Sequence, residues 1–166
     1  MFTLRKIVLV LMVDAVPLGR ARFSRGHVYV PQRSRDYRKV LQTAARQAMS
    51  VLNAPPMEGE LYARLSVYRK FNATSRNFGD LDNHAKAICD AFNGLIYRDD
   101  SQIIAVQLTK HTDKTSPRVV AEFGDVDFMD AELPTTGTES LQIVSGVLHV
   151  PRICPCEPRS AAVSVD

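Results

Sequence analysis

The alternation of apolar and polar positions predicts most of the elements of this chain. Positions 4–13 are mainly apolar, which indicates a buried strand, and Leu61 to Phe71 alternates with period two, which is typical of a half-buried strand. Residues 35–52 carry apolar side chains at i, i+3 and i+4, which predicts a helix with Ser34 as its N-cap. Residues 28–30 would add a short strand that closes a hairpin.

The second half of the chain predicts one more helix and two more strands. We expect the helix from about 83 to 93, ended by Gly94. Strand patterns follow at 102–108 and 118–123, and the polar stretch 110–117 would join them as a hairpin. The predicted fold is a single α+β domain in which two helices pack on a mixed sheet of about five strands.

The organisation along the chain is simple. We expect one folded domain over residues 1–126 and a partly disordered C-terminal extension over residues 127–166, where the periodicity is lost. The apolar run 7–13 is too short to span a bilayer, and no small-residue cleavage site follows it. We therefore expect a cytoplasmic protein with no membrane partner.

Charge is distributed unevenly between the two halves of the chain. Residues 1–78 hold 14 Lys and Arg against 4 Asp and Glu, whereas residues 79–166 hold 7 against 14. A basic half beside an acidic cluster is typical of an enzyme that binds a polyanion and holds a metal ion, although surface charge without a function is the alternative. The basic side chains that we predict to contact phosphates are Arg20, Arg22, Arg25, Arg69 and Lys70.

Four aspartates flank the second predicted helix. Asp80 and Asp82 would share one side of an extended entry segment, and Lys86 would reach the same point from the next helical turn. Only one of Asp99 and Asp100 would enter the site, because adjacent residues of a strand point to opposite faces. Carboxylates that converge repel one another and need a hard cation such as Mg²⁺. The pattern therefore indicates metal-dependent chemistry on a phosphate backbone.

Simpler interpretations remain open at this point. Asp82 would serve only as a helix cap, Asp82 and Lys86 only as an i,i+4 ion pair, and Asp99-Asp100 only as a turn. The lone His84 is interpreted as a surface or structural residue. The sequence contains neither a phosphate-binding Gly-rich loop with Lys nor a His-Glu-x-x-His zinc motif, and no EF-hand glutamate stands at the required position.

A resemblance to a known family rests on a long motif of fixed spacing. The motif consists of Asp80-Leu81-Asp82-Asn83, then Lys86, Asp90-Ala91-Phe92-Asn93-Gly94-Leu95 and Asp99-Asp100-Ser101-Gln102-Ile103. It resembles the RusA family of Holliday junction resolvases. The loop Pro17-Leu18-Gly19-Arg20-Ala21-Arg22-Phe23 also resembles the Pro-x-Gly-Arg-x-Arg-Phe loop of that family. The resemblance covers roughly residues 5–125.

The resemblance implies a structure-selective DNA endonuclease that acts as a homodimer in recombination and repair. Its two sites would nick symmetric strands of a four-way junction with Mg²⁺ or Mn²⁺. Asp80, Asp82 and Asp100 would be catalytic metal ligands and Lys86 an essential lysine. Accessory roles would fall to Asp99, as a further carboxylate, and to Asn83, which would help to position the backbone.

One departure and two alternatives accompany the resemblance. The family often has a basic residue just before the first aspartate, where this chain has Gly79, so Arg76 would supply that DNA contact instead. A non-catalytic dimer that binds branched DNA is the first alternative, and it would use the aspartates only to cap and brace the helix. The second is a metal nuclease that acts on flaps or replication forks.

Overall fold

A mixed four-stranded sheet is the centre of the fold. The computed structural model describes residues 4–19, 22–24 and 27–128. Neighbouring strands lie in the order β1-β6-β4-β5, with β5 parallel to β4 and with β6 antiparallel to both β1 and β4. The strands are β1 (Lys6–Leu11), β4 (Leu61–Arg69), β5 (Ile103–Thr112) and β6 (Arg118–Asp125).

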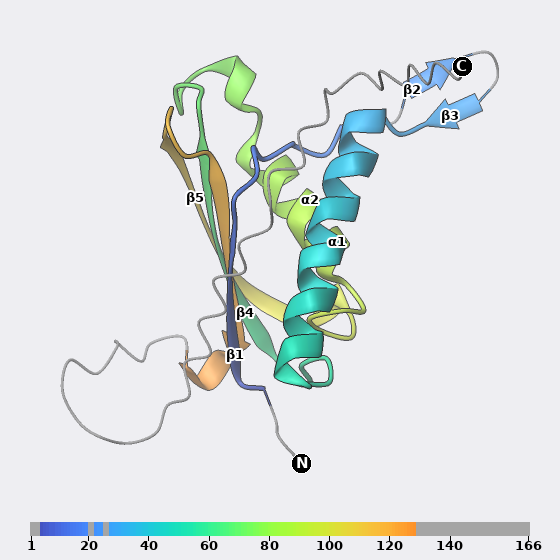
Figure 1. Ribbon diagram of the computed structural model, residues 1–166, viewed down its shortest axis with the longest axis vertical. Helices are drawn as coiled ribbons and strands as arrows, with labels where there is room; N and C mark the ends of the chain where they lie inside the picture. Colours follow the sequence, from blue (N-terminus) through green and yellow to red (C-terminus); the bar gives the residue numbers. More distant parts are fainter. Residues whose placement is uncertain (1–3, 20–21, 25–26, 129–166) are drawn as a thin grey trace, which may run out of the picture.

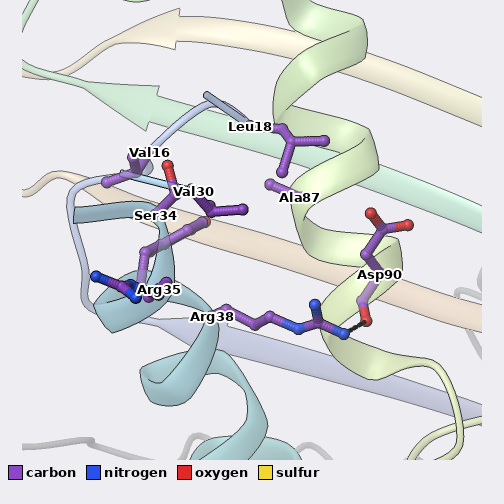
Figure 2. A pocket seen from close by; sticks show the side chains of 9 residues that line it. Val16, Leu18, Val30, Ser34, Arg35, Arg38, Ala87 and Asp90 are labelled. Atoms are coloured by element: carbon purple, nitrogen blue, oxygen red, sulfur yellow. Dashed lines mark hydrogen bonds between the residues drawn. The ribbon is translucent and has the colours of Figure 1, made fainter. Parts of the chain in front are cut away.

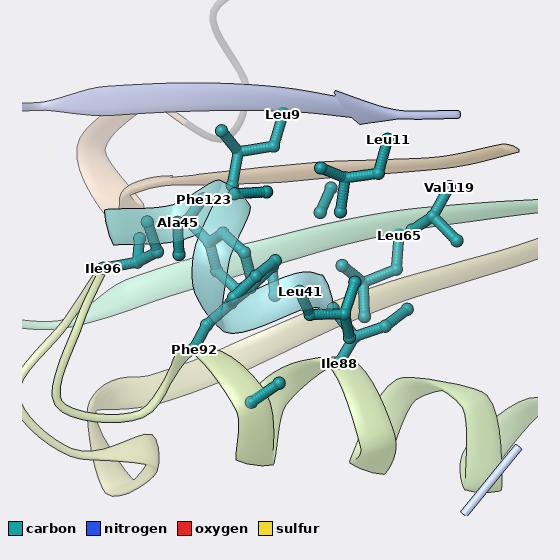
Figure 3. Close-up of a cluster of buried hydrophobic side chains, with 14 of the residues drawn as sticks. Leu9, Leu11, Leu41, Ala45, Leu65, Ile88, Phe92, Ile96, Val119 and Phe123 are labelled. Atoms are coloured by element: carbon teal, nitrogen blue, oxygen red, sulfur yellow. The ribbon is translucent and has the colours of Figure 1, made fainter. Parts of the chain in front are cut away.

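Two helices, α1 (Gln32–Leu52) and α2 (Leu81–Phe92), cover one face of this sheet (Figure 1). The core lies between the helices and the sheet, where apolar residues at alternate strand positions meet those at helical spacing (Figure 3). β4 alternates as its sequence predicts, since its odd-numbered residues face the helices. Residues with 0–1% exposure from these elements include Leu9, Leu11, Leu41, Leu65, Ile88, Phe92, Val119 and Phe123.

The path of the chain through β4, α2 and β5 determines where the acidic residues lie. Because β4 and β5 are parallel, α2 must carry the chain back from the carboxyl end of one strand to the amino end of the next. The segment that precedes α2 and the segment that follows it therefore lie at opposite ends of the sheet.

The predicted fold class is confirmed, with a difference in the strand count. The structure is a single α+β domain with two helices on a mixed sheet, but the sheet has four strands rather than five. The short strand expected at 28–30 is β3 (His27–Tyr29), which pairs with β2 (Arg22–Ser24) in a separate two-stranded sheet. This small sheet extends beyond the amino end of α1 (Figure 1).

The hairpin predicted from residues 102–123 was wrong. β5 and β6 do not pair, because β4 lies between them and pairs with both. The backbone N–H of Asp113, in the connection, donates to the carbonyl of Arg69 at 2.7 Å, so the chain crosses the end of β4 instead of turning back on itself. Placing β4 in the centre covers both of its edges and buries its regular apolar face.

The predicted helix ends also differ from the observed ones. α1 begins at Gln32, with Pro31 at the N-cap position, so Ser34 lies in the first turn and is not the cap. α2 begins at Leu81 with Asp80 as its N-cap, two residues earlier than expected. Its buried face is consequently centred on His84, Ala87, Ile88, Ala91 and Phe92, whereas Leu81, Ala85 and Cys89 are only half-buried.

Three short 3-10 turns complete the described chain: η1 (Arg76–Phe78), η2 (Asp100–Gln102) and η3 (Val126–Phe128). None of the helices in the described ranges is long and apolar enough to cross a bilayer. Most of the predicted C-terminal extension, from residue 129 onward, lies outside the described residues.

Candidate active site

Asp80 occupies the N-cap of α2 without using its side chain as a cap. Its backbone is extended, with φ −75° and ψ 140°, and its carbonyl accepts a hydrogen bond from the N–H of His84 at 3.2 Å. An N-cap aspartate usually accepts a bond from a free N–H of the first turn, but the carboxylate of Asp80 accepts none. Instead, its Oδ2 accepts a long hydrogen bond from Nδ2 of Asn83, at 3.4 Å. The carboxylate is exposed and remains available to a ligand.

Asp82 lies in the first turn of α2 and is also exposed. Within the described part of the chain its carboxylate has no hydrogen-bond or ion-pair partner. The expectation that Asp80 and Asp82 share an extended segment was wrong, because the helix already includes Asp82. Both carboxylates nevertheless lie at the positive end of the helix dipole, which favours negative charge. Their Cα atoms are at most about 7 Å apart, since two residues of chain reach no further.

The turn before Asp80 is anchored on a buried arginine. Arg69, at the end of β4, is 2% exposed, and its Nε donates to Oδ1 of Asp14 at 3.0 Å. Its Nη1 donates to the carbonyls of Asn77 and Phe78, the residues that precede Gly79 and Asp80. The prediction that Arg69 contacts DNA was therefore wrong. The period-two pattern held the signal, because position 69 continues the buried face of Leu61 to Val67.

His84 supports the same turn from α2. Its Nε2 donates to the carbonyl of Phe78 at 2.8 Å, and the side chain is fully buried. Burial lowers the pKa of His84, which favours the neutral imidazole. A neutral imidazole with its proton on Nε2 donates to the carbonyl as observed. The interpretation of His84 as structural is confirmed. Gly79 has φ +88°, and a Cβ placed there would stand 2.9 Å from Cγ of Pro17, so the turn requires glycine.

The second acidic pair divides into one occupied and one free carboxylate. Asp99 is the N-cap of η2, and its Oδ1 accepts a bond from the N–H of Ser101 at 3.0 Å. Hydrogen bonding by the side chain of Ser101, and then by its backbone, lowers the pKa of Asp99. Gln102 completes a capping box, since its Oε1 accepts from the N–H of Asp99 at 3.0 Å. Asp100 is exposed and has no side-chain partner among the described residues. The two residues lie in a turn rather than in a strand, so their separate roles come from the capping box.

The structure does not bring Asp100 to Asp80 and Asp82 within one chain. Asp100 lies near Cys89, which belongs to the last turns of α2. Burial raises the pKa of the Cys89 thiol to about 11, and the charges of Asp90 and Asp100 also raise it. Cys89 is seven residues beyond Asp82, or about 10 Å along the helix axis. The described residues contain no group of three or more His, Cys, Asp or Glu side chains that would hold a metal ion. The expected convergence of all three aspartates is therefore not formed in the single chain.

The donor set at the start of α2 fits a hard cation all the same. Mg²⁺ prefers carboxylate oxygens, keeps several waters and is usually held by one or two carboxylates together with substrate phosphates. Asp80 and Asp82 provide two neighbouring, exposed carboxylates of this kind. The remaining ligands would then come from water, from the phosphate backbone and from a further carboxylate.

Lys86 lies on the exposed side of α2, one turn after Asp82. Its Nζ forms an i,i+4 ion pair with Oδ1 of Asp90 at 3.6 Å, so the alternative pair with Asp82 is not the one that forms. The Lys86 side chain is 62% exposed. Exposed pairs of this kind contribute little to stability, so the ammonium group is available to another anion.

The remaining predicted DNA contacts are placed only in part. Lys70 and Arg76 are exposed near the carboxyl end of β4, on the same side of the molecule as the turn that leads to Asp80. Arg20 and Arg25 lie outside the described residues. Arg22 belongs to β2, and its side chain is not described.

The amino half of α1 carries basic residues that the sequence interpretation missed. The first turn contains no acidic residue, and Arg33, Arg35, Arg38 and Lys39 are exposed. Like charge at the positive end of a helix is unfavourable and becomes favourable when an anion binds there. The signal was available as a run of basic residues within a predicted helix, whereas the predicted phosphate contacts lay in loops and at a strand end.

A pocket of about 300 Å³ lies between α1, α2 and the segment that carries Val16 and Leu18 (Figure 2). Its wall is mostly apolar, and Arg35 and Arg38 extend along its α1 side. Nη2 of Arg38 donates to the carbonyl of Asp90 at 3.2 Å, which satisfies a carbonyl near the carboxyl end of α2. The contact joins the basic half of α1 to the helix that carries Asp82 and Lys86.

The comparison with protein families agrees with the motif. The family model described as endodeoxyribonuclease RusA matches residues 13–122, which include every described acidic residue of the candidate site. No match was found among curated proteins. Because the family match spans well over half of the chain, this protein belongs to the RusA family of endodeoxyribonucleases, the Holliday junction resolvases.

Proposed function

We propose that this protein resolves four-way DNA junctions by paired symmetric nicks, as a homodimer that uses Mg²⁺ or Mn²⁺, in recombination and repair. The observation that carries the proposal is the state of Asp80. It stands at an N-cap, yet its carboxylate caps nothing and is exposed beside the equally exposed Asp82. In a RusA-family chain, two such carboxylates at the positive end of a helix suit a divalent cation at the scissile phosphate.

Each site residue then has a distinct task. A bound divalent cation polarises the phosphate and lowers the pKa of a coordinated water. Asp80 and Asp82 would bind the cation, and Asp100 would be the further carboxylate, because Asp99 is occupied by its cap. Lys86 would leave its exposed pair with Asp90 and offset the negative charge that develops on the phosphate.

The DNA would bind to the basic residues around this end of the molecule. The exposed side chains in question are Arg33, Arg35, Arg38, Lys39, Lys70 and Arg76, to which Arg20, Arg22 and Arg25 would be added. Each phosphate contact releases counterions, so replacing one contact residue should lower the magnitude of the salt-dependence slope by about one unit. An unchanged slope after Arg38→Ala would exclude that residue as a contact.

The homodimer would account for the separation of Asp100 from the other two aspartates. β5 is an edge strand of 10 residues and exposes Ile104 and Val106, at 56% and 52%. Unpaired, apolar edges are prone to pair with another strand. If two copies paired antiparallel through β5, the start of β5 in one copy would lie beside the end of β5 in the other. Asp100 comes shortly before the start of β5. The end of β5 lies beside Arg69, next to the turn that carries Asp80.

Mixed dimers test this arrangement. Asp82→Asn and Asp100→Asn are each expected to be inactive alone, but a mixture of the two should recover single nicks, because one of its two sites retains both wild-type residues. Sites built from one chain would leave the mixture inactive. A monomeric mass at micromolar concentration would contradict the dimer altogether.

The function itself is tested with branched substrates. Wild-type protein should introduce paired nicks into a synthetic four-way junction in Mg²⁺, leave linear duplex uncut and lose all cleavage in EDTA. Tight junction binding without nicks in Mg²⁺ or Mn²⁺ would favour the non-catalytic DNA-binding dimer. Faster cleavage of flaps or forks than of the junction would favour the flap or fork nuclease.

A further inference from the structure

Two buried side chains donate to one carbonyl just before Asp80. Nη1 of Arg69 and Nε2 of His84 both reach the oxygen of Phe78, the latter at 2.8 Å. Arg69 is 2% exposed, and His84 and Phe78 are 0% exposed. A buried carbonyl that accepts two hydrogen bonds cannot rotate without leaving both donors unpaired, which is costly. The peptide plane between Phe78 and Gly79 is therefore fixed.

Arg69 is itself held on several sides. Its Nε binds Oδ1 of Asp14 at 3.0 Å, and its Nη1 also donates to the carbonyl of Asn77 at 3.1 Å. The guanidinium group lies 4.9 Å from the ring centroid of Phe71 and 5.6 Å from that of Phe78. Since these partners come from three separate parts of the chain, the guanidinium position reports the assembled tertiary structure and not the local turn.

The turn before Asp80 is also restrained on the side that faces Pro17. Gly79 packs so closely on Pro17 that a Cβ would lie 2.9 Å from Cγ. The N–H of Leu18 donates to the carbonyl of Asn83 at 3.0 Å, which ties this segment to the first turn of α2. Because the turn is restrained on both sides, the backbone at Gly79 and Asp80 has little conformational freedom.

We propose that Arg69 and His84 are positioning residues for Asp80: by holding the Phe78 carbonyl they aim the exposed Asp80 carboxylate at the metal and the scissile phosphate. This inference rests on the proposed function. It differs from a purely structural role, which would lower stability and leave the metal dependence of a folded enzyme unchanged.

The test uses the full chain with two variants and one matched control. Arg69→Met removes all of the arginine donors, and His84→Leu removes one donor while keeping an apolar side chain on the buried face of α2. The second variant keeps the proposal testable if Arg69→Met does not fold. Arg118→Met is the control, because Arg118 makes contacts of the same kind at the other side of the sheet. Its Nη1 donates to Asp113 Oδ2 at 2.6 Å and to the carbonyl of Ser116 at 2.9 Å.

Hydrogen exchange, the rate and Mg²⁺ dependence of cleavage, junction affinity and thermal stability are measured for each protein. In metal-free protein, hydrogen exchange of the amides at residues 77–82 should become at least about tenfold faster in Arg69→Met and His84→Leu, and remain unchanged in Arg118→Met. In cleavage of a four-way junction, the rate should fall by about 10–100-fold, and the Mg²⁺ concentration for half-maximal cleavage should rise about tenfold. Junction affinity in EDTA should equal that of wild type, and Arg118→Met should cleave normally.

Each other result has a defined meaning. Unchanged hydrogen exchange in both variants would show that Arg69 and His84 do not restrain the turn. Faster exchange with normal cleavage and normal Mg²⁺ dependence would overturn the positioning role. Loss of activity in Arg118→Met, in proportion to its loss of thermal stability, would do the same. An inactive wild type would refute the proposed function instead, while hydrogen exchange would still decide whether Arg69 and His84 hold the turn.

Discussion

The two acidic segments on either side of α2 are held in different ways. The first, residues 79–82, depends on side chains far away in the sequence: Arg69 holds its entry turn together with Asp14, His84 binds the same turn, and Pro17 covers Gly79. The second, residues 99–102, is shaped by its own capping box of Asp99 and Gln102, and Gln102 also donates to the carbonyls of Met57 and Gly59. The first turn therefore has no capping bond from its own aspartate and depends on distant side chains, whereas the second combines a local cap with one distant anchor.

The two segments should therefore respond to different substitutions. We expect changes at Arg69 or His84 to move Asp80, and changes in the capping box or in the segment 57–59 to move Asp100. The first segment also carries two of the three predicted metal ligands, so its tertiary contacts would restrain most of the predicted site.

Within the second segment, the largest effect should come from its free carboxylate. Asp100→Asn removes a charged metal ligand and should reduce junction cleavage by about 10²–10³-fold. Asp99→Asn keeps an oxygen that can accept the bond from Ser101 and should stay within about tenfold of wild type. Cleavage rates of the two variants at saturating junction check this order, and the reverse order would exchange the roles of the two aspartates.

The next effect concerns Gly79 and has a matched control. Gly79→Ala adds backbone strain at φ +88° and a contact with Pro17, so it should lower the free energy of unfolding by about 2–4 kcal/mol. Gly94→Ala adds strain at φ +73° but meets nothing within 4 Å, and should cost about 1 kcal/mol. Urea denaturation measures both. Equal losses would show that the Pro17 contact does not restrain the turn.

A smaller effect should follow loss of the local cap. Gln102→Ala removes bonds to the N–H groups of Arg98 and Asp99 and a bond at 2.9 Å to the carbonyl of Gly59. It should cost about 1 kcal/mol and raise hydrogen exchange near residues 98–102 and 57–59, but not at residues 77–82. Faster exchange at residues 77–82 in this variant would mean that the two segments are coupled.

The smallest effect should come from Asp90. Its pair with Lys86 at 3.6 Å is exposed on the helix surface, so Asp90→Asn should change the free energy of unfolding by no more than about 0.5 kcal/mol. Cleavage should persist, because the ammonium group of Lys86 remains. A loss above about 1 kcal/mol, measured by denaturation, would show that the pair holds α2 and is not readily given up to a phosphate.

The sequence predicted the elements better than their partners. Period-two alternation marked β4, and helical spacing marked α1, because both signals are local. The hairpin of β5 and β6 was wrong, since nothing local shows that β4 lies between them. The early start of α2 also escaped prediction, because it depends on Gly79 turning against Pro17, more than sixty residues away.

The same limit applies to the site. The spacing of the acidic residues predicted Asp80 and Asp82, and the family resemblance added Asp100, but neither showed that the crossover through α2 sets Asp100 apart. Arg69 was interpreted as a DNA contact because charge alone does not reveal burial, and its partner Asp14 stands 55 residues earlier. The different roles of Asp99 and Asp100 could not be predicted from the sequence. They follow from the capping box, in which the Asp99 carboxylate accepts a backbone N–H and the Asp100 carboxylate stays free.

Junction binding and junction cleavage, measured side by side for wild type and Asp82→Asn, test whether the carboxylates at the start of α2 bind the metal. We expect Asp82→Asn to bind a four-way junction with wild-type affinity in EDTA but to introduce no nicks in Mg²⁺, while the wild type produces paired symmetric nicks. Unchanged turnover in Asp82→Asn would contradict the assignment of the carboxylates at the start of α2 as the metal-binding site.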